Sequence, residues 1–281
     1  MTTLHEREVL DWRARRRVRL TARDGWLSLI ALEWLAEGPT SLGSDPSNDI
    51  VLPPSAPTRV AVLEVADGRA VARVDAGAAV MIDDQPAGGR VPMRDDGEGR
   101  PTVLRVGAIS FHVIVREGLL ALRVRDATGP ARDELAPLEY FPIDARWRVE
   151  AGFRPYDRPK KLPVPTVLEV AETYLVPGEL AFEAGGHRWR LKVFQEQGET
   201  DLFIVFADQT NGVETYRGGR YLYAKPAGPS GTTVVDFNQA YNPPCVFTPF
   251  ATCALPLPDN RLRFRVEAGE KRYRPTRRSP S

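Results

Sequence analysis

Short valine-rich runs that recur every eight to twelve residues dominate the stretch from Thr40 to Asp126. Clusters of Gly, Pro and Asp separate them, and the run Arg59–Val65 (RVAVLEV) alternates polar and apolar residues. Strands with one buried face, joined by turns at this spacing, are typical of an antiparallel β-sandwich. We therefore expect such a sandwich over residues 40–126, with strands near residues 50–52, 60–65, 70–74, 79–82, 103–106, 109–115 and 119–124.

The residues before this domain predict a helical segment over residues 1–39. His5–Arg19 lacks Gly and Pro and is rich in helix formers, so we expect a helix there. Its loose apolar stripe predicts that the helix docks on the body of the protein. Trp26–Leu35 is apolar, and its pattern fits either a buried strand or a short helix.

Residues 127–281 predict a second β domain that begins with a connector. Ala127–Pro165 is rich in proline and in large aromatics, which favours an ordered connector. Later runs predict the strands of a second antiparallel β-sandwich or barrel, at residues 187–193, 201–206, 232–237 and 261–266. The tail from Lys271 is expected to fray. The whole chain is thus predicted to be mainly β with one N-terminal helix.

Composition excludes several classes of function. With 38 basic and 37 acidic residues the net charge is +1, so no overall field attracts nucleic acid. The arginines within residues 13–19 are interpreted as a solvated helix face. No apolar run is long enough to cross a membrane, and no secretory signal pattern is present. We expect a cytoplasmic protein with reduced thiols at its two cysteines, and the oligomeric state stays open.

The polar segment Asp236–Cys245 (DFNQAYNPPC) holds the strongest candidate for a functional site. Buried polar groups need partners, so it is either a self-bonded irregular crossing or the lining of a site. Pro243–Pro244 stiffens the chain between Tyr241 and Cys245. Gly218–Gly219 permits a close backbone approach beside Arg220, whose side chain can grip a carboxylate or phosphate. The predicted ligand-binding residues are Tyr216, Arg220, Asp236, Asn238, Tyr241, Asn242 and Cys245.

Catalytic and metal-binding alternatives follow from the same residues. Cys245 as a nucleophile needs a base, for which His187 is available, with Asp236 as a third member. If Arg220 is structural instead, Asp236 or Glu214 is its expected partner. Cys245, Cys253 and His187 give only three ligands for zinc, and a Cys245–Cys253 disulfide needs an oxidising environment. We expect no metal and no cofactor, and the catalytic residues stay unknown.

Part of the predicted sandwich resembles forkhead-associated domains. Leu42–Leu52 (LGSDPSNDIVL) resembles their opening strands, and Leu104–Phe111 their closing ones. Phosphothreonine binding in that family uses an Arg where Ser44 stands here, and a Ser-Arg-x-His stretch that Thr58–Ala61 lacks. Asp83–Asp84 replaces the usual Asn-Gly turn. The resemblance therefore implies a structural module that has lost phosphopeptide binding.

The C-terminal half closely resembles a bacterial domain-of-unknown-function family, number 1684. The segments that carry this resemblance are Thr210–Tyr216, Gly218–Leu222, Asp236–Cys245, Cys253–Pro258, Asn260–Leu262 and Glu267–Lys271. The resemblance implies no activity. We expect non-enzymatic binding of a small polar or anionic molecule or a partner protein; the alternative is a hydrolase-like enzyme that uses the Arg220, Asp236, Tyr241 and Cys245 region.

Overall fold

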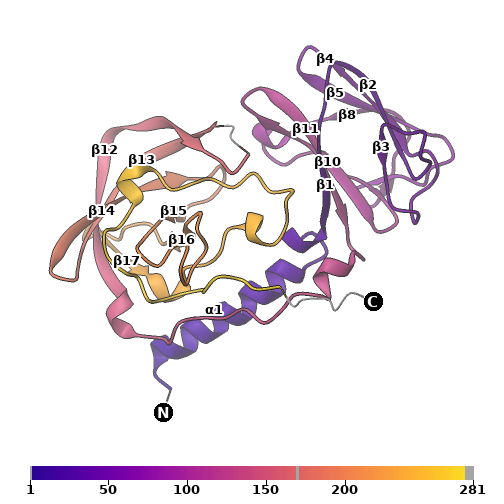
Figure 1. Ribbon diagram of the computed structural model, residues 1–281. Helices are drawn as coiled ribbons and strands as arrows, with labels where there is room; N and C mark the ends of the chain where they lie inside the picture. Colours follow the sequence, from indigo (N-terminus) through magenta and orange to yellow (C-terminus); the bar gives the residue numbers. More distant parts are fainter. Residues whose placement is uncertain (1, 169–170, 276–281) are drawn as a thin grey trace. The chain divides into compact units, whose positions relative to one another are not determined.

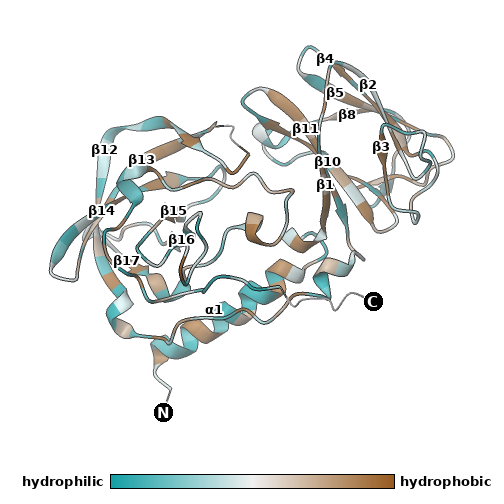
Figure 2. Cartoon of the chain, in the orientation of Figure 1, coloured by the Kyte–Doolittle hydropathy of each residue, from teal (hydrophilic) through white to brown (hydrophobic). Residues whose placement is uncertain are grey.

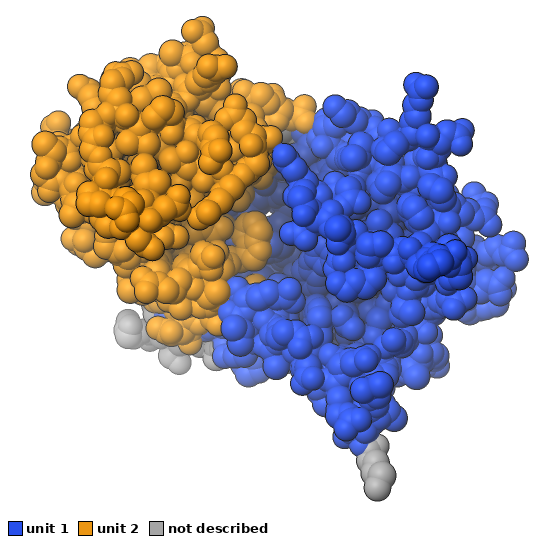
Figure 3. Space-filling model, turned by 180° about the vertical axis from the view of Figure 1, so that it is seen from behind, with its two compact units in different colours: residues 1–19, 134–281 blue, residues 20–133 orange. Residues whose placement is uncertain are grey.

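A computed structural model of the protein describes residues 2–168 and 171–275 and divides the chain into two compact units (Figures 1 and 3). Unit 1 consists of residues 1–19 and 134–281, and unit 2 of residues 20–133. The sequence-based division kept residues 1–39 as a separate segment. In the structure these residues are shared between the units, because the helix packs on the C-terminal half whereas the apolar run after it joins a sheet of unit 2.

Unit 2 is built from two β-sheets that enclose one hydrophobic core. One sheet has the strand order β1-β11-β10-β9-β6-β7 and the other β3-β2-β4-β5-β8. All pairings are antiparallel except the parallel pair β2 and β3. The strands are β1 (Leu29–Trp34), β2 (Gly38–Gly43), β3 (Ile50–Val51), β4 (Ala61–Ala66), β5 (Arg69–Val74), β6 (Met81–Ile82), β7 (Gln85–Pro86), β8 (Gly89–Met93), β9 (Leu104–Val106), β10 (Ile109–Arg116) and β11 (Leu119–Asp126).

The alternation in the sequence accounts for these strands. Along β4, every second residue is buried and its neighbours are half-buried or exposed. Strands β10 and β11 are largely hydrophobic (brown in Figure 2), and their inward residues fill the core. Asp83 and Asp84 both have positive φ angles, of 45° and 64°, in the two-residue turn between β6 and β7. A tight hairpin turn of this kind requires positive φ at both central positions, which Asp tolerates better than most residues.

Unit 1 combines helix α1 with one curled antiparallel sheet of strand order β16-β15-β14-β13-β12-β17. Strands β16 and β17, at the two edges of the sheet, contact each other, so the sheet forms a half-barrel. Helix α1 spans Leu4–Thr21, and its last two residues belong to unit 2. The strands are β12 (Arg148–Pro165), β13 (Ala171–Ala184), β14 (His187–Gln195), β15 (Leu202–Phe206), β16 (Arg220–Ala224) and β17 (Thr232–Asp236).

Short 3₁₀ helices complete the described chain, and they lie mainly in the connections. They are η1 (Trp26–Ser28), η2 (Asp96–Glu98), η3 (Pro130–Arg132), η4 (Ala145–Trp147), η5 (Phe237–Gln239), η6 (Pro244–Val246) and η7 (Pro258–Asn260). The apolar run after α1, which fitted either a strand or a helix in the sequence, contains both, η1 followed by β1.

Strand β15 is buried on both faces, as its continuous apolar run LFIVF predicts. Leu202, Ile204 and Phe206 point into the half-barrel core. Phe203 points to the other side and packs against the rings of Tyr221 and Tyr223. The chain around Cys253 contacts this outer layer, because the Tyr221 hydroxyl donates to the Ala254 carbonyl over 2.9 Å. The segment after β17 is therefore structured by the sheet beneath it.

Two sequence-based predictions for this unit are wrong. The predicted connector contains β12, an 18-residue strand. Pro155 and Pro159 lie at a register shift in the pairing with β13, and Pro163 and Pro165 lie beyond the five residues of β12 that also pair with β17, so their missing amides interrupt no second ladder. The predicted strand at residues 261–266 is irregular, with one isolated parallel bridge from Arg261 to Ala207. The fully buried Asn260 side chain supplies pairing there instead, bonding both backbone groups of Lys192 and the Val205 carbonyl. The predicted mainly-β fold with an N-terminal helix is confirmed.

Candidate functional site

Arg220 lies in the interior of unit 1, with no exposed surface. One terminal nitrogen donates to the Asp208 carboxylate at 2.7 Å and to the Val266 carbonyl at 2.9 Å. The other donates to the Ala268 carbonyl. Burial lowers the pKa of the guanidinium, and the nearby Asp208 carboxylate opposes that shift. Its ion-pair partner is thus Asp208, rather than the Asp236 or Glu214 expected from the sequence, and the contacts hold the C-terminal chain against β16.

Asp208 also organises the turn that follows β15. Its second carboxylate oxygen accepts hydrogen bonds from the amides of Thr210 and Val266. The Asn211 amide group donates to the Tyr216 carbonyl at 2.6 Å. The polar groups of residues 210–216 are therefore engaged in hydrogen bonds within the turn and to Asp208, the partner of Arg220.

Asp236 and Asn238 face each other at the end of β17, as their spacing predicts. One Asp236 oxygen accepts from the Asn238 side chain at 2.8 Å, and Asn238 also bonds the Asp144 backbone. The other Asp236 oxygen lies 2.8 Å from His5 Nε2 of helix α1. No local sequence pattern could indicate His5 as a partner, because 231 residues separate it from Asp236. Their contact pins the start of the helix to the sheet.

Asn242 is buried in a second cluster that anchors the middle of α1. Its amide donates to Glu270, a carboxylate with no exposed surface, at 2.8 Å. Arg16 donates to the same carboxylate at 3.1 Å and to the Asn242 carbonyl at 2.8 Å. The Arg16 guanidinium also lies 4.5 Å from the centre of the Tyr241 ring. Burial raises the pKa of the Tyr241 phenol. These residues bind the helix.

Tyr216 and Cys245 form a third cluster, together with Cys253. The Tyr216 hydroxyl lies 3.7 Å from Cys245 Sγ, and the Cys245 amide donates to Cys253 Sγ at 3.2 Å. Both cysteines are free thiols; Cys245 is half-buried and Cys253 is 4% exposed. A hydrogen bond with the Cys253 thiol, and then one with Tyr216, lowers the pKa of Cys245. Burial raises the pKa of Cys253, and burial together with the Cys245 contact raises that of Tyr216 to about 12.

Besides Arg220 in the core, the predicted ligand-binding residues therefore occupy three separate clusters: Asp236 with Asn238 at His5, Tyr241 with Asn242 at Arg16, and Tyr216 with Cys245 at Cys253. These contacts do not bring together Cys245, His187 and Asp236, the catalytic alternative from the sequence, because Asp236 pairs with His5. The exposed His187 instead packs its ring against Trp189 at 6.2 Å.

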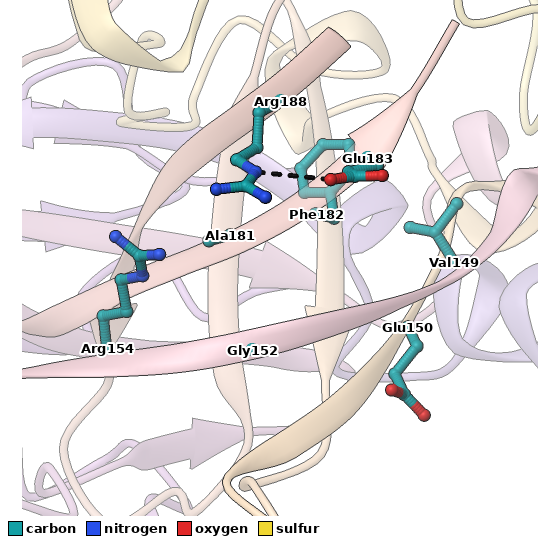
Figure 4. Close-up of a pocket in the computed structure, with 8 residues that line it drawn as sticks. All are labelled: Val149, Glu150, Gly152, Arg154, Ala181, Phe182, Glu183 and Arg188. Atoms are coloured by element: carbon teal, nitrogen blue, oxygen red, sulfur yellow. Dashed lines mark hydrogen bonds and ion pairs between the residues drawn. The ribbon is translucent and has the colours of Figure 1, made fainter. Parts of the chain in front are cut away.

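A hollow of about 470 Å³ lies on the outer face of the sheet, where sequence reasoning placed nothing. Gly152 of β12 is paired with Ala181 of β13, so two small residues stand side by side. Residues two positions apart on a strand share a face, which places Glu150 and Arg154 on either side of Gly152. The lining comprises Val149, Glu150, Gly152, Arg154, Ala181, Phe182, Glu183 and Arg188 (Figure 4).

Two guanidinium groups converge on this hollow. Figure 4 shows Arg154 and Arg188 extending toward Ala181 from β12 and β14, whereas the Glu150 carboxylate points away. Arg188 pairs with Glu183 at 3.3 Å, and Arg154 makes no ion pair within the part of the chain that the structure describes. The register that aligns Gly152 with Ala181 creates the site, and the sequence could not show it because β12 was interpreted as a connector.

The loops of unit 2 that correspond to the forkhead-associated motif are tied to each other. The Asn48 side chain donates to the carbonyls of Asp45 at 2.8 Å and Thr58 at 2.9 Å. Gly43 approaches Thr58 so closely that a Cβ at Gly43 would overlap the Thr58 carbonyl. Arg59, beside this junction, is exposed. The loss of phosphopeptide binding stays a prediction.

Within residues 2–168 and 171–275, no three His, Cys, Asp or Glu side chains gather closely enough to hold a metal ion. Across the same ranges, no helix combines the length and the apolar character needed to cross a membrane.

Comparison with known proteins identifies the family. The model described as "Protein of unknown function (DUF1684)" matches residues 133–271. The chain belongs to this family. An uncharacterized protein of Haloarcula marismortui, solved by NMR, is 32% identical to this member of the family over 50% of this chain and 78% of that chain, with a TM-score of 0.43.

Solved forkhead-associated (FHA) domains are also similar to this family member. The FHA-2 domain of a Mycobacterium tuberculosis ABC transporter is 23% identical, covering 32% of this chain and 77% of that chain with a TM-score of 0.24. The FHA domain of a Chlamydia trachomatis protein is 17% identical, covering 34% and 94% with a TM-score of 0.23. No curated protein matches the chain significantly.

Proposed function

We propose that unit 1 is a non-enzymatic binding module that takes a small anionic ligand in the hollow between Gly152 and Ala181. The observation that carries this proposal is the convergence of Arg154 and Arg188 on a hollow opened by two small residues (Figure 4). Guanidinium groups bind carboxylates and phosphates through paired, charge-assisted hydrogen bonds. The ligand class is therefore a small molecule that carries a carboxylate or phosphate group.

The exposure of both arginines limits the expected affinity. The Arg188 side chain is 74% exposed, so solvent screens its interaction with an anion. Exposed charge pairs contribute roughly 0–1 kcal/mol each. Two or three such contacts contribute at most about 3 kcal/mol, so we expect a dissociation constant on the order of 10 mM for a simple anion. Tighter binding requires a ligand whose body also fills the apolar floor at Ala181.

Among the residues that line the hollow there is no Ser, Thr, Cys or His side chain, and binding alone is our proposal for it.

The test is a chemical-shift titration of the isotopically labelled protein with inorganic phosphate and with citrate. We expect saturable shifts at residues around Gly152 and Ala181. Gly152→Leu should remove them by filling the hollow, because Gly152 has an ordinary strand conformation and a Cβ there meets nothing closer than 3.9 Å. Arg154→Met should weaken the shifts.

Arg158→Met is the matched control, since Arg158 is an exposed arginine on the same strand outside the hollow. If Arg158→Met and Arg154→Met weaken the chemical-shift changes equally, the changes arise from nonspecific attraction of the anion to surface charge, and the proposal is wrong. Saturable binding that persists in a folded Gly152→Leu variant would place the site elsewhere.

A further inference from the structure

Cys245 and Cys253 are eight residues apart in the sequence and adjacent in the fold. Cys253 Sγ lies 3.2 Å from the backbone nitrogen of Cys245, and the Cys245 side chain branches from the next atom along that backbone. A disulfide requires Cβ atoms roughly 3.5–4.5 Å apart, and a contact this short between the sulfur of one cysteine and the backbone of the other places the two side chains next to each other.

The two thiols differ in access. Cys245 is half-buried on η6. Cys253 is only 4% exposed and belongs to the chain that bonds with the end of β12. The Val167 amide donates to the Cys253 carbonyl at 3.0 Å, which holds that residue in place. A reagent in solution therefore meets Cys245 first, and Cys253 is reached through Cys245.

A phenol lies beside the accessible thiol. The Tyr216 hydroxyl, 3.7 Å from Cys245 Sγ, can donate a hydrogen bond to a thiolate at that sulfur. Tyr221, in turn, donates its hydroxyl proton to the Ala254 carbonyl at 2.9 Å, next to Cys253. Hydrogen bonds to a thiolate favour ionisation, and the thiolate is the form that attacks disulfides.

We propose that Cys245 and Cys253 form a reversible redox pair that exchanges with low-molecular-weight disulfides, with Cys245 as the attacking thiol and Cys253 as the resolving one. This inference is independent of the anion site on the outer face of the sheet. Intracellular disulfides of this kind are typically transient and regulatory or catalytic.

The exchange balances in two steps. The Cys245 thiolate attacks one sulfur of a disulfide RSSR, forms a Cys245–SR mixed disulfide and releases RS⁻, which takes up a proton. Cys253 then loses its proton to solvent and attacks Cys245 Sγ, which forms the intramolecular disulfide and releases the second RS⁻. The protein loses two hydrogens and is oxidised, while RSSR is reduced to two RSH.

The test uses oxidised glutathione and the full chain, read by mass spectrometry of tryptic peptides. No Lys or Arg lies between Lys225 and Arg261, so both cysteines fall in one peptide. We expect the wild type to lose two hydrogens in that peptide and Cys253→Ser to retain a stable glutathione adduct on Cys245. Cys245→Ser should react with oxidised glutathione at least about tenfold more slowly than the wild type, because its remaining thiol is buried.

Tyr216→Phe tests the positioning role of the phenol through a pH profile. Removing the hydroxyl should move the midpoint for iodoacetamide alkylation of Cys245 to higher pH, whereas a merely structural role would leave the midpoint in place. Far-UV circular dichroism checks that each variant is folded. The wild-type peptide map tests the proposal even if a variant fails to fold.

Three results would overturn the proposal. They are a wild-type peptide that keeps both hydrogens, an adduct on Cys253 formed in Cys245→Ser at the wild-type rate, and a wild-type protein that accumulates the mixed disulfide without resolving it.

Discussion

Replacing Arg220 with methionine gives the most direct test of how unit 1 is held together. Methionine keeps much of the volume of the side chain and removes its charge and all of its donors. The Asp208 carboxylate, whose side chain is 0% exposed, is then left without its cation. The carbonyls of Val266 and Ala268 lose their donor at the same time. The C-terminal chain thus loses its attachment to β16.

The magnitude follows from burial. Breaking a buried ion pair by removing one partner costs about 3–5 kcal/mol, because the remaining charge is desolvated and uncompensated. Asp208 keeps the amides of Thr210 and Val266, which favours the lower end of that range. For a domain of this size each kcal/mol shifts the melting temperature by about 2–4 °C, so we expect a decrease of about 6–20 °C.

The assay is urea unfolding followed by circular dichroism, with Arg265→Met as the control. Arg265 also pairs with two carboxylates, those of Glu214 and Glu267, but its side chain is 42% exposed, so its loss should cost no more than about 1 kcal/mol. The double variant Asp208→Asn with Arg220→Met should be more stable than Arg220→Met alone, because no buried charge is left. Equal effects of Arg220→Met and Arg265→Met would refute the reasoning.

Two further predictions follow, one for each unit. Gly219→Ala should destabilise unit 1 by about 2–4 kcal/mol in thermal unfolding, because the φ of Gly219 is +93° and a Cβ would lie 2.5 Å from Pro256. The control is Gly185→Ala, which should cost about 1 kcal/mol in the same assay because Gly185 also has a positive φ but faces open space. Burial, and then Arg123, lowers the pKa of His112 from 6.5 to about 4, so the unfolded state binds its proton first as the pH falls. Stability should therefore decrease between pH 6.5 and 4, by up to about 3 kcal/mol, and His112→Gln should flatten that slope in urea unfolding; parallel slopes would contradict the assignment.

Some predictions from the sequence succeeded because their signals are local. The continuous apolar run of β15 and the alternation of β14 were both predicted within a few residues of their observed bounds. The proline-rich stretch that contains β12 was misjudged, because proline normally disfavours a paired strand. A register shift between Pro155 and Lys160 relieves that conflict, and no single strand's sequence reveals a register shift in its pairing.

The candidate site shows the same division. The polar residues were identified, but their partners were not, since Asp236 meets His5 and Asn242 meets Arg16 from a helix more than two hundred residues earlier. The hollow at Gly152 exists only because β12 and β13 align it with Ala181.

The amino-acid sequence by itself determined the mainly-β architecture, the N-terminal helix and the family, because residue periodicity and turn chemistry act over a few neighbouring residues. Tertiary structure alone decided which charges pair, which thiols touch and where the surface is hollowed. Those outcomes depend on distances between segments that are remote in the chain, and such distances are fixed only once the sheet has curled and the helix has docked on unit 1.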